Sequence, residues 1–354
     1  MRRVGIIATG QTMHRRTDAT ATDLVHRVVR SAISTSGLSR HDIDYTCAAS
    51  SDFLEGRPFS FGFALDAVGA VPPIEESHIE GDGAWAAYDA WIRIQAGLAD
   101  AALVVAWGKS SEGSLSAVLN TTLDPFWEAP LGADAVTLAA LQAQAWMART
   151  GAREDELLAT IARNHTAGSK NPSAPQRPAP RRDAPLAVEP YRRDMLPAVT
   201  DGACALVMAA EEVAARTAEP VAWIAAAAHA SDAASIGARD LSVASSARTA
   251  IGAADPERDW RMLDVAEVMA PFPHQEPMLL DALEINAAHV NPSGGAWYAN
   301  PLMATGLVRL AEAAKQVTGT AGPHQAPGAR RALAHATSGH ALQQNMVFLL
   351  EGTP

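Results

Sequence analysis

The sequence predicts an α/β fold made of two similar halves with a segment inserted between them. In the first third of the chain, short apolar runs alternate with helical patterns. The runs stop in the middle and return in the same order in the second half. Alternating strand and helix patterns are typical of helices layered on parallel strands. At 354 residues, 48% of them hydrophobic, the chain can build one large or two medium-sized domains.

The first third contains strand patterns at residues 4–8, 43–50 and 99–108 and helical patterns at 20–37 and 83–97. Both helical patterns end on a glycine, which readily takes the left-handed conformation that closes a helix. The run at 99–108 is apolar without interruption, as expected of a strand covered on both faces.

Strand patterns are absent from residues 114–197. Helical patterns at 133–151 and 153–168 lead into a stretch rich in proline and arginine, and long loops of this kind tend to cover binding sites. We therefore predict an N-terminal half at 1–113 plus 198–216, an inserted loop domain at 114–197 and a C-terminal half at 217–354.

The last part of the chain repeats the alternation. Residues 200–216 read as a strand followed by a helix, and further strand patterns lie at 221–230, 260–272, 330–340 and 345–352. Helical patterns separate them at 242–254, 274–283 and 301–319. The repeated order predicts a duplicated architecture.

Composition excludes several classes of protein. The net charge of −11 argues against nonspecific nucleic-acid binding, although it allows an anionic small ligand. No apolar run is long enough to span a membrane, and the apolar part of MRRVGIIATG is too short for a secretory leader. The two cysteines, Cys47 and Cys204, form no metal-type cluster, so we expect a reduced, cytoplasmic protein without a bound metal.

Four blocks together resemble the thiolase superfamily. GLADAALVVAWGKSSE (97–112) is similar to its segment ending GxxKMSE, and RNHTAGSKNPSAP (163–175) to its loop-domain motif. TDGACALVMAAEE (200–212) is similar to SDGAAALVLASEE, and VNPSGGAWYANPLMATG (290–306) to NPxGGAxxxGHPxGATG. The branch that this chain most resembles is the sterol-carrier or lipid-transfer type. The resemblance implies a five-layer αβαβα fold, usually a homodimer, that binds acyl-coenzyme A.

The family's catalytic residues are not carried over. Alignment on Gly83 places Glu80 at the position of the nucleophilic cysteine. Met269 replaces the Asn or His of NEAF or HDxF, Asn300 replaces the His of GHP, and Ala336 replaces the Cys of CxGG. Thiolysis requires a thiolate stabilised by a helix start and a base, so we do not expect a Cys-dependent acyl transfer.

Some lipid-transfer-type members that lack this Cys are retro-aldolases. The resemblance implies cleavage of a β-hydroxyacyl-CoA, as in steroid side-chain degradation, together with a small partner carrying an OB fold and a zinc ribbon. Coenzyme A then enters as part of the substrate, and no covalently bound cofactor is needed. Aldol cleavage requires only a base for the β-hydroxyl proton and donors that stabilise the thioester enolate.

Four side chains are candidates for this chemistry: Tyr298, Asn300, His340 and Asp82. Tyr298 is the first choice as base, and Asn300 could donate to the thioester oxygen, but a structural tyrosine and an Asn-Pro turn explain them as well. His340 follows ATSG and could titrate near neutrality. For Asp82, before a predicted helix, capping is the more plausible role, with a catalytic carboxylate as the alternative.

Less specific candidates surround these four. His335 is read as a packed or solvent-facing residue, with a role at the site as the alternative, and His274 either faces the pocket or begins a helix as a surface residue. Arginines that could hold the phosphates of coenzyme A, or simply pair with nearby acids, crowd the Pro-rich stretch at Arg177, Arg181, Arg182, Arg192 and Arg193. A pantetheine arm could pass close to Ser293, Gly294 and Gly295.

Two other functions stay open at this point. The first is a catalytically inactive, thiolase-like scaffold or acyl-CoA-binding subunit. The second, weaker one is an acyltransferase that uses Ser293 or Thr337 as nucleophile. A cavity plugged by Trp85, Met269 or Trp297 would exclude the enzymatic hypotheses.

Overall fold

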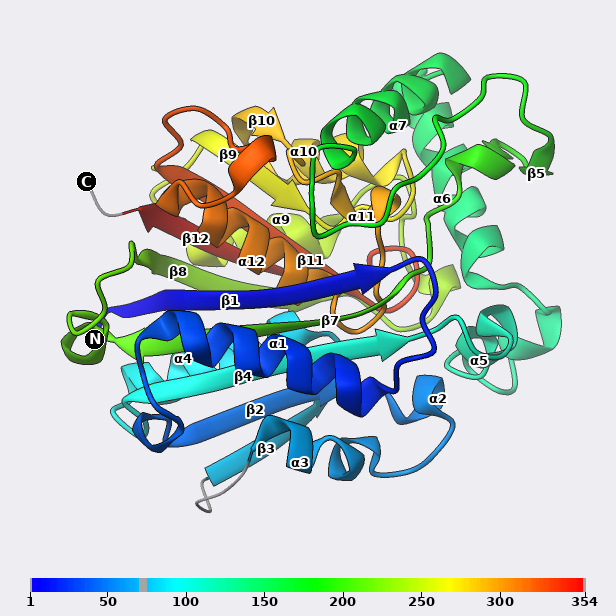
Figure 1. The fold of residues 1–354 in the computed structure, drawn as a ribbon. Helices are drawn as coiled ribbons and strands as arrows, with labels where there is room; N and C mark the ends of the chain where they lie inside the picture. The colour runs from blue at the N-terminus through cyan, green and yellow to red at the C-terminus, as the bar shows by residue number, and fades with distance from the viewer. Residues whose placement is uncertain (1, 70–74, 353–354) are drawn as a thin grey trace.

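The computed structural model describes residues 2–69 and 75–352, and it confirms the α/β class with duplicated halves. One continuous ten-stranded sheet runs through the described chain (Figure 1). Its N-terminal half contains β1 (Val4–His14), β7 (Asp201–Ala210), β4 (Ala101–Lys109), β2 (Tyr45–Ser50) and β3 (Glu75–Glu80), in this spatial order.

The C-terminal half repeats this order. It contains β8 (Ala222–Ser231), β12 (Gln344–Gly352), β11 (Arg331–Ser338), β9 (Met262–Val268) and β10 (Asn286–Val290). In both halves the first three strands are antiparallel to their neighbours and the last three are parallel. Each half therefore combines the parallel strands that the sequence predicts with antiparallel ones, because it also contains a strand that returns without a crossover helix.

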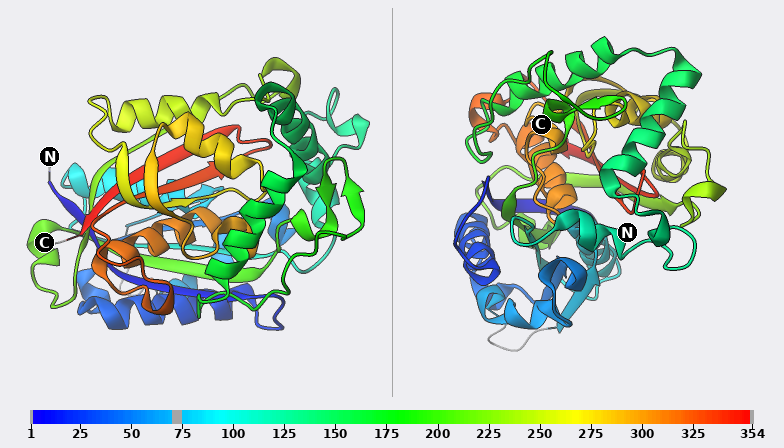
Figure 2. Two further views of the ribbon diagram at one scale, coloured as in Figure 1. Left: turned by 90° about the horizontal axis from the view of Figure 1, so that it is seen from above. Right: turned by 90° about the vertical axis from the view of Figure 1, so that its right-hand side faces the viewer.

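The two halves join through β1 and β8, which pair antiparallel over residues 4–6 and 222–224. The N-terminal half places α1 (Ala21–Ser36) on its outer face and α4 (Gly83–Gln95) on its inner face. The C-terminal half places α9 (Ser245–Ala254) and α10 (Gln275–Leu283) outside and α12 (Thr305–Thr318) inside. Each half of the continuous sheet forms one layer, and α4 and α12 pack against each other between the two layers. The result is a helix–sheet–helix–sheet–helix arrangement, shown from two further sides in Figure 2.

Local sequence explains the ends of these helices. Thr20 and Asp23 form a capping box at the start of α1, and Gly37 closes the helix in the left-handed conformation at φ 74°. Asp82 caps α4, since its side chain accepts a hydrogen bond from the Ala84 amide. The central helix α12 is buried over almost its whole length, as a layer between two sheets requires.

The inserted segment contains α5 (Leu115–Asn120), α6 (Ala135–Thr150) and α7 (Glu154–Gly168). The expectation that it lacks strands is wrong, because β5 (Leu186–Val188) and β6 (Tyr191–Arg192) pair there in a sheet of their own. Both are too short to give an alternating pattern. The strands β3 and β10 were also missed, because half-exposed edge strands lack a continuous apolar run.

No helix in the described ranges combines the length and apolarity that crossing a bilayer requires. The domain boundaries drawn from the sequence stay a prediction.

Candidate functional site

A cavity of about 440 Å³ lies where the two halves meet the inserted segment. Its lining comes from the segments after β2, β3 and β9, from the segment before α12, from the β11–β12 turn, and from α5 and α6. Crevices at strand ends are the usual ligand sites of α/β proteins. The cavity opens to solvent, since Phe53 in its wall is 55% exposed and Ser116 and Gly339 are exposed as well.

Most of the lining is apolar and includes Leu115, Leu119, Val136, Ala139, Phe272 and Leu302. Three of the four residues predicted to do chemistry, Asp82, Asn300 and His340, join them in the same cavity. The fourth, Tyr298, is not part of this lining. An apolar pocket with a few convergent polar groups is the usual form of a site for a small organic molecule.

Asp82 bridges the starts of the two central helices. Its Oδ1 accepts from the Ala84 amide at 2.9 Å in α4, and its Oδ2 accepts from the Gly306 amide at 2.9 Å in α12. The helix starts favour the carboxylate, but burial opposes them and raises the pKa of Asp82 to about 7. A carboxyl group with such a pKa can take up and release a proton near neutrality. The predicted capping role and a role at the cavity are therefore compatible.

Asn300 is held by its carbonyl side. The Thr305 hydroxyl, in the first turn of α12, lies 2.7 Å from Asn300 Oδ1 and 2.9 Å from the Pro301 carbonyl, so these two oxygens share its one proton. Among the described residues, no hydrogen-bond partner meets the amide nitrogen of this buried side chain. The amide is thus a pre-oriented donor in the wall of the cavity.

His340 follows β11 and reaches the inserted segment. Its Nε2 lies 3.0 Å from the hydroxyl of Thr122, just after α5. Burial lowers the pKa of His340, while the Leu119 carbonyl and Glu128 oppose this effect. The imidazole is therefore mostly neutral at pH 7 and able to accept a proton.

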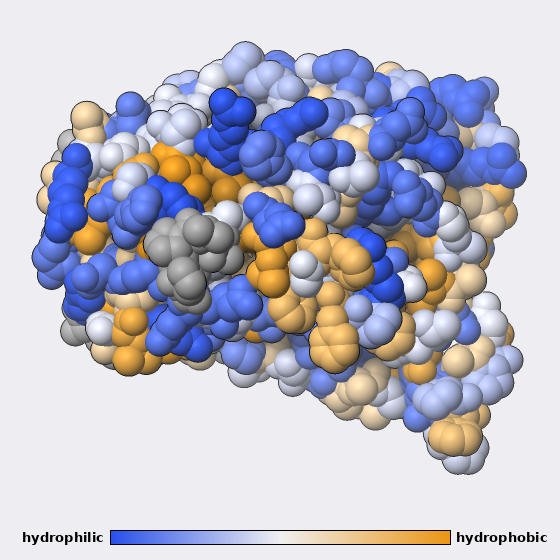
Figure 3. Space-filling model, turned by 60° about the horizontal axis from the view of Figure 1, so that its bottom comes forward, coloured by the Kyte–Doolittle hydropathy of each residue, from blue (hydrophilic) through white to orange (hydrophobic). Residues whose placement is uncertain are grey.

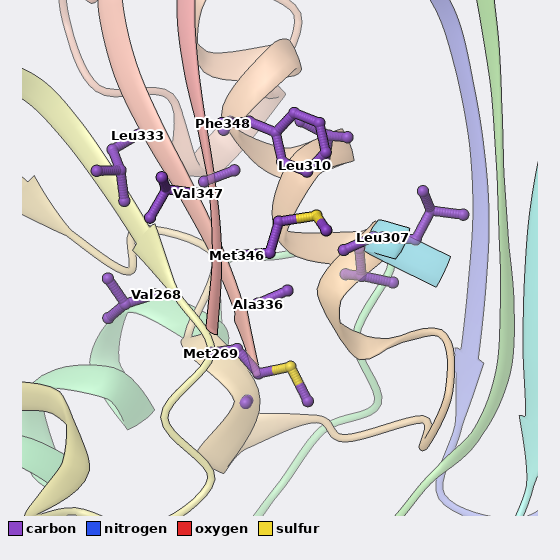
Figure 4. Close-up of a cluster of buried hydrophobic side chains, with 14 of the residues drawn as sticks. Val268, Met269, Leu307, Leu310, Leu333, Ala336, Met346, Val347 and Phe348 are labelled. Atoms are coloured by element: carbon purple, nitrogen blue, oxygen red, sulfur yellow. The ribbon is translucent and has the colours of Figure 1, made fainter. Parts of the chain in front are cut away.

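Two of the four positions at which the resembled family has catalytic groups, Met269 and Ala336, are apolar here. Met269 and Ala336 lie beside Leu307 of α12 among buried side chains (Figure 4). Cys47 and Cys204 are buried on β2 and β7, outside the cavity lining, and burial raises the pKa of both thiols, that of Cys47 to about 11. Neither cysteine can supply a thiolate to this cavity. Trp85 and Trp297 do not line it, and Met269 lines it without filling it.

Tyr298 packs elsewhere. It belongs to the single-turn helix α11 (Gly295–Tyr298) and lies beside His165 of α7, with ring centroids 5.9 Å apart. Its hydroxyl is buried and has no hydrogen-bond partner among the described residues. Gly294 and Ser293 are likewise enclosed by protein: a Cβ at Gly294 would lie 2.5 Å from Gly168 Cα, and Ser293 bonds Glu267 and Arg309. A Cβ at Gly295 would similarly lie 2.9 Å from Asn291 Cγ.

The arginines of the Pro-rich stretch lie outside the cavity lining. Arg177 donates to the backbone carbonyls of Trp297, Asp194 and Leu196 and stacks on the Trp297 ring, so it ties the segment to the core. Ion pairs join Arg181 to Asp194, Arg182 to Asp155 and Arg192 to Glu154, in line with the alternative of paired surface charges.

The two remaining histidines are packed. His274 is fully buried between Tyr191 and Gln142, so neither a surface nor a pocket position is correct for it, and burial lowers its pKa to about 3. His335 bonds Asn345, and burial lowers its pKa to about 4. Thr122 could not be predicted as a neighbour of His340, because their contact spans 218 positions along the chain.

Comparisons with known proteins agree with this architecture. Residues 215–351 match the family described as thiolase C-terminal domain-like. A solved structure named "Ltp2-ChsH2(DUF35) aldolase" is similar with a TM-score of 0.80 at 19% identity, covering 99% of this chain and 97% of that one. By sequence alone, no curated protein matches the chain.

Two further structures share the fold. The Bacillus anthracis acetyl-CoA acetyltransferase has a TM-score of 0.77 at 16% identity, over 100% of this chain and 99% of that one. A monomeric SCP2-thiolase-like protein type 1 from Mycobacterium smegmatis has a TM-score of 0.76 at 18% identity, over 99% of this chain and 78% of that one. These findings confirm the resemblance seen in the sequence: the chain has the thiolase-like fold, and its residues 215–351 match the thiolase C-terminal domain-like family.

Proposed function

We propose that the protein is a C–C lyase that cleaves a β-hydroxyacyl-CoA by a retro-aldol reaction without a cysteine nucleophile. The observation that carries the proposal is the set of polar groups in the cavity. Asp82, Asn300 and His340 meet in one solvent-connected, largely apolar cavity that contains no thiol. This set offers a base, an acid and a hydrogen-bond donor, which are the groups that aldol cleavage requires.

In the proposed reaction, neutral His340 takes the proton from the β-hydroxyl group. The Cα–Cβ bond then breaks, the β-carbon becomes the carbonyl of a released ketone or aldehyde, and the electron pair moves into the thioester as an enolate. The Asn300 amide donates to the enolate oxygen, where negative charge develops. Asp82, protonated about half of the time near pH 7, delivers a proton to Cα, and solvent later returns the proton from His340 to Asp82.

The lining supports an acyl-CoA with an apolar acyl group. Burial of apolar surface against Leu115, Leu119 and Val136 contributes about 25 cal/mol per Å² to binding such a group. Contact of the coenzyme A phosphates with Arg181 or Arg182 stays part of the proposal. Both would have to release Asp194 or Asp155, which costs little because these ion pairs are exposed.

A protein partner belongs to the proposal as well. The similar aldolase structure is named as a complex that includes a DUF35 component, which supports a small OB-fold and zinc-ribbon partner for this chain. Apolar residues gather on part of one face of the molecule (Figure 3). Elsewhere along the chain, Phe126, Trp127 and Leu131 expose about four fifths of their surface, which supports an association site, in a homodimer or with the partner.

The test is an assay of product release. The protein, alone and with its partner, is incubated with β-hydroxyacyl-CoA, and mass spectrometry follows the ketone or aldehyde and the shortened acyl-CoA. We expect both products in equal amounts. Asn300→Ala should lower kcat about 10²- to 10³-fold, as does removal of other oxyanion donors. Release of free coenzyme A, or full activity in both His340→Ala and Asn300→Ala, would contradict the proposal.

One observation favours the alternative of an inactive scaffold. None of the predicted phosphate-binding arginines faces the cavity, so that part of a coenzyme A site is not preassembled. A scaffold would show the same lack of products with the partner as without it.

The acyltransferase alternative now concerns Thr337 alone, because Ser293 is sealed beneath Arg309 and Glu267 whereas Thr337 lines the cavity. It predicts an acyl adduct on Thr337 after incubation with acetyl-CoA.

A further inference from the structure

Thr122 and His340 come from different parts of the chain. Thr122 follows α5 in the inserted segment, His340 follows β11 in the C-terminal half, and both line the cavity. Their contact is the hydrogen bond of 3.0 Å between Thr122 Oγ1 and His340 Nε2.

The direction of this bond follows from a proton count. The Thr122 hydroxyl donates to the Leu119 carbonyl at 2.7 Å. A hydroxyl group has one proton, so it can only accept in its second contact. His340 must therefore donate through Nε2, which places the ring proton on Nε2 and leaves the lone pair on Nδ1.

Nδ1 of His340 is not one of the sealed nitrogens, in contrast to Nδ1 of His335. The Leu119 carbonyl, which the ring also contacts, is the acceptor of the Thr122 hydroxyl and lies at the same helix end. A neutral imidazole whose one nitrogen is fixed as a donor presents the other as its only basic atom.

The backbone on both sides of His340 is fixed independently of Thr122. Arg239 donates to the carbonyls of His340 at 2.9 Å and Ala341 at 3.1 Å, and Gln142 donates to Ala341 at 3.0 Å. Removal of the Thr122 hydroxyl should therefore change the ring and leave the turn in place.

We propose that Thr122 is a positioning residue that fixes His340 as its Nε2–H tautomer, so that Nδ1 is the atom that takes the substrate proton. The proposal rests on the proposed function for the identity of that proton. It also links two tasks of one helix, because Leu115 and Leu119 of α5 contact the acyl group while the end of α5 orients the base.

The chain offers a matched control. Thr121 precedes Thr122 at the end of α5, is also exposed, and donates to the carbonyl of Val118 without contacting His340. Thr121→Val removes the same hydroxyl from the same helix end, and Thr122→Ser keeps the hydroxyl that Thr122→Val removes.

The first readout is the ¹⁵N NMR spectrum of the His340 ring in the ligand-free protein above the histidine pKa. We expect the Nε2–H tautomer in the wild type, in Thr121→Val and in Thr122→Ser, and a mixture of tautomers in Thr122→Val. A wild-type ring protonated on Nδ1, or a ring signal unaffected by Thr122→Val, would overturn the proposal.

The second readout is cleavage of β-hydroxyacyl-CoA. Thr122→Val should lower kcat about 3- to 10-fold at constant KM, as expected for one partly exposed hydrogen bond, and Thr122→Ser should restore it. Thr122→Val should also shift the acid limb of the kcat–pH profile. Glu128 and Arg239, the charged residues near His340, are unchanged in all variants and affect this limb equally in each. If the NMR result holds but no variant cleaves the substrate, the positioning stands and the proposed function fails.

Discussion

Asp82 shows how one residue serves both the fold and the site. A carboxylate that ties two helix starts together would normally stay ionised. The burial that makes this bridge possible also raises its pKa to about 7, which gives the same group a titration near neutral pH. Asp82 is thus both a cap for two helices and a titratable carboxyl group in the wall of the cavity.

The stability of the protein should therefore depend on Asp82. Between the carboxyl's ordinary pKa of about 4 and its folded pKa of about 7, the native state holds a proton that the unfolded state has lost. The contribution of Asp82 to the free energy of unfolding should fall by about 1.4 kcal/mol per pH unit as pH rises through this window. Urea unfolding of wild type and Asp82→Asn at pH 5, 6 and 7 measures the difference in slope. Parallel curves for the two proteins would show that Asp82 is ionised throughout.

The buried histidines act in the opposite direction. The folded pKa of His335 lies at about 4, below the ordinary value near 6.5, so the unfolded state binds the extra proton between these values. Stability from neutral His335 is complete above pH 6.5 and is lost as pH falls towards 4. His335→Gln should flatten this acid limb in thermal unfolding followed from pH 7 to pH 4, whereas an unchanged limb would assign the loss to other groups.

At the scale of elements, a buried ion pair connects a strand to a central helix. Arg309 Nη1 in α12 lies 2.6 Å from Glu267 Oε2 in β9, and both side chains are almost fully buried. Glu267 also accepts hydrogen bonds from the amide and the hydroxyl of Ser293. Arg309→Met should cost about 3–5 kcal/mol, because it leaves a buried carboxylate without its counter-charge. The double variant Glu267→Gln/Arg309→Met should recover much of this loss, since the glutamine still accepts from the Ser293 amide. Urea unfolding checks both, and a double variant as unstable as the single one would contradict the explanation.

Two helical glycines form a second comparison. A Cβ at Gly168, the last residue of α7, would lie 2.4 Å from the Tyr298 ring, whereas a Cβ at Gly252 in α9 would meet nothing within 4 Å. Gly168→Ala should lose about 1–3 kcal/mol of stability through overpacking, and Gly252→Ala should gain about 0.5–1 kcal/mol through helix propensity. Chemical denaturation measures both changes relative to the wild type. If the midpoint shifted in the same direction for the two variants, the tight contact of α7 with α11 would be contradicted.

Elements with a strong local signal could be predicted from the sequence. The helix α1 has an amphipathic pattern and a capping box, and β4 and β7 are continuous apolar runs. β3 and β5 could not be predicted, because an exposed edge strand and a three-residue strand are defined by their hydrogen bonds to a neighbour and not by their own composition.

The same limit applies to the site. Asp82 and Asn300 were proposed because they lie in motifs that precede predicted helices, and both line the cavity. Tyr298 shares a motif with Asn300, yet the chain turns between them, and the tyrosine packs against α7 while the asparagine lines the cavity. The direction in which neighbouring side chains point depends on tertiary packing, and proximity in sequence does not determine it.

For the molecule as a whole, the duplicated architecture determines where the cavity lies. Each half brings one central helix to the middle layer, and the starts of α4 and α12 meet at Asp82. The inserted segment then closes the opening between the halves with α5 and α6. The arrangement creates a solvent-connected, mainly apolar cavity beside two helix starts, and neither cysteine lines it.

The central claim is that this thiol-free cavity binds an acyl-CoA. Its most direct test is calorimetric titration of a β-hydroxyacyl-CoA into the wild type and into Leu119→Trp, which fills the cavity from the partly exposed face of α5. We predict saturable binding to the wild type, with a negative heat-capacity change from apolar burial, and at least about tenfold weaker binding to the variant. No binding to the wild type, or equal binding to both proteins, would contradict the account.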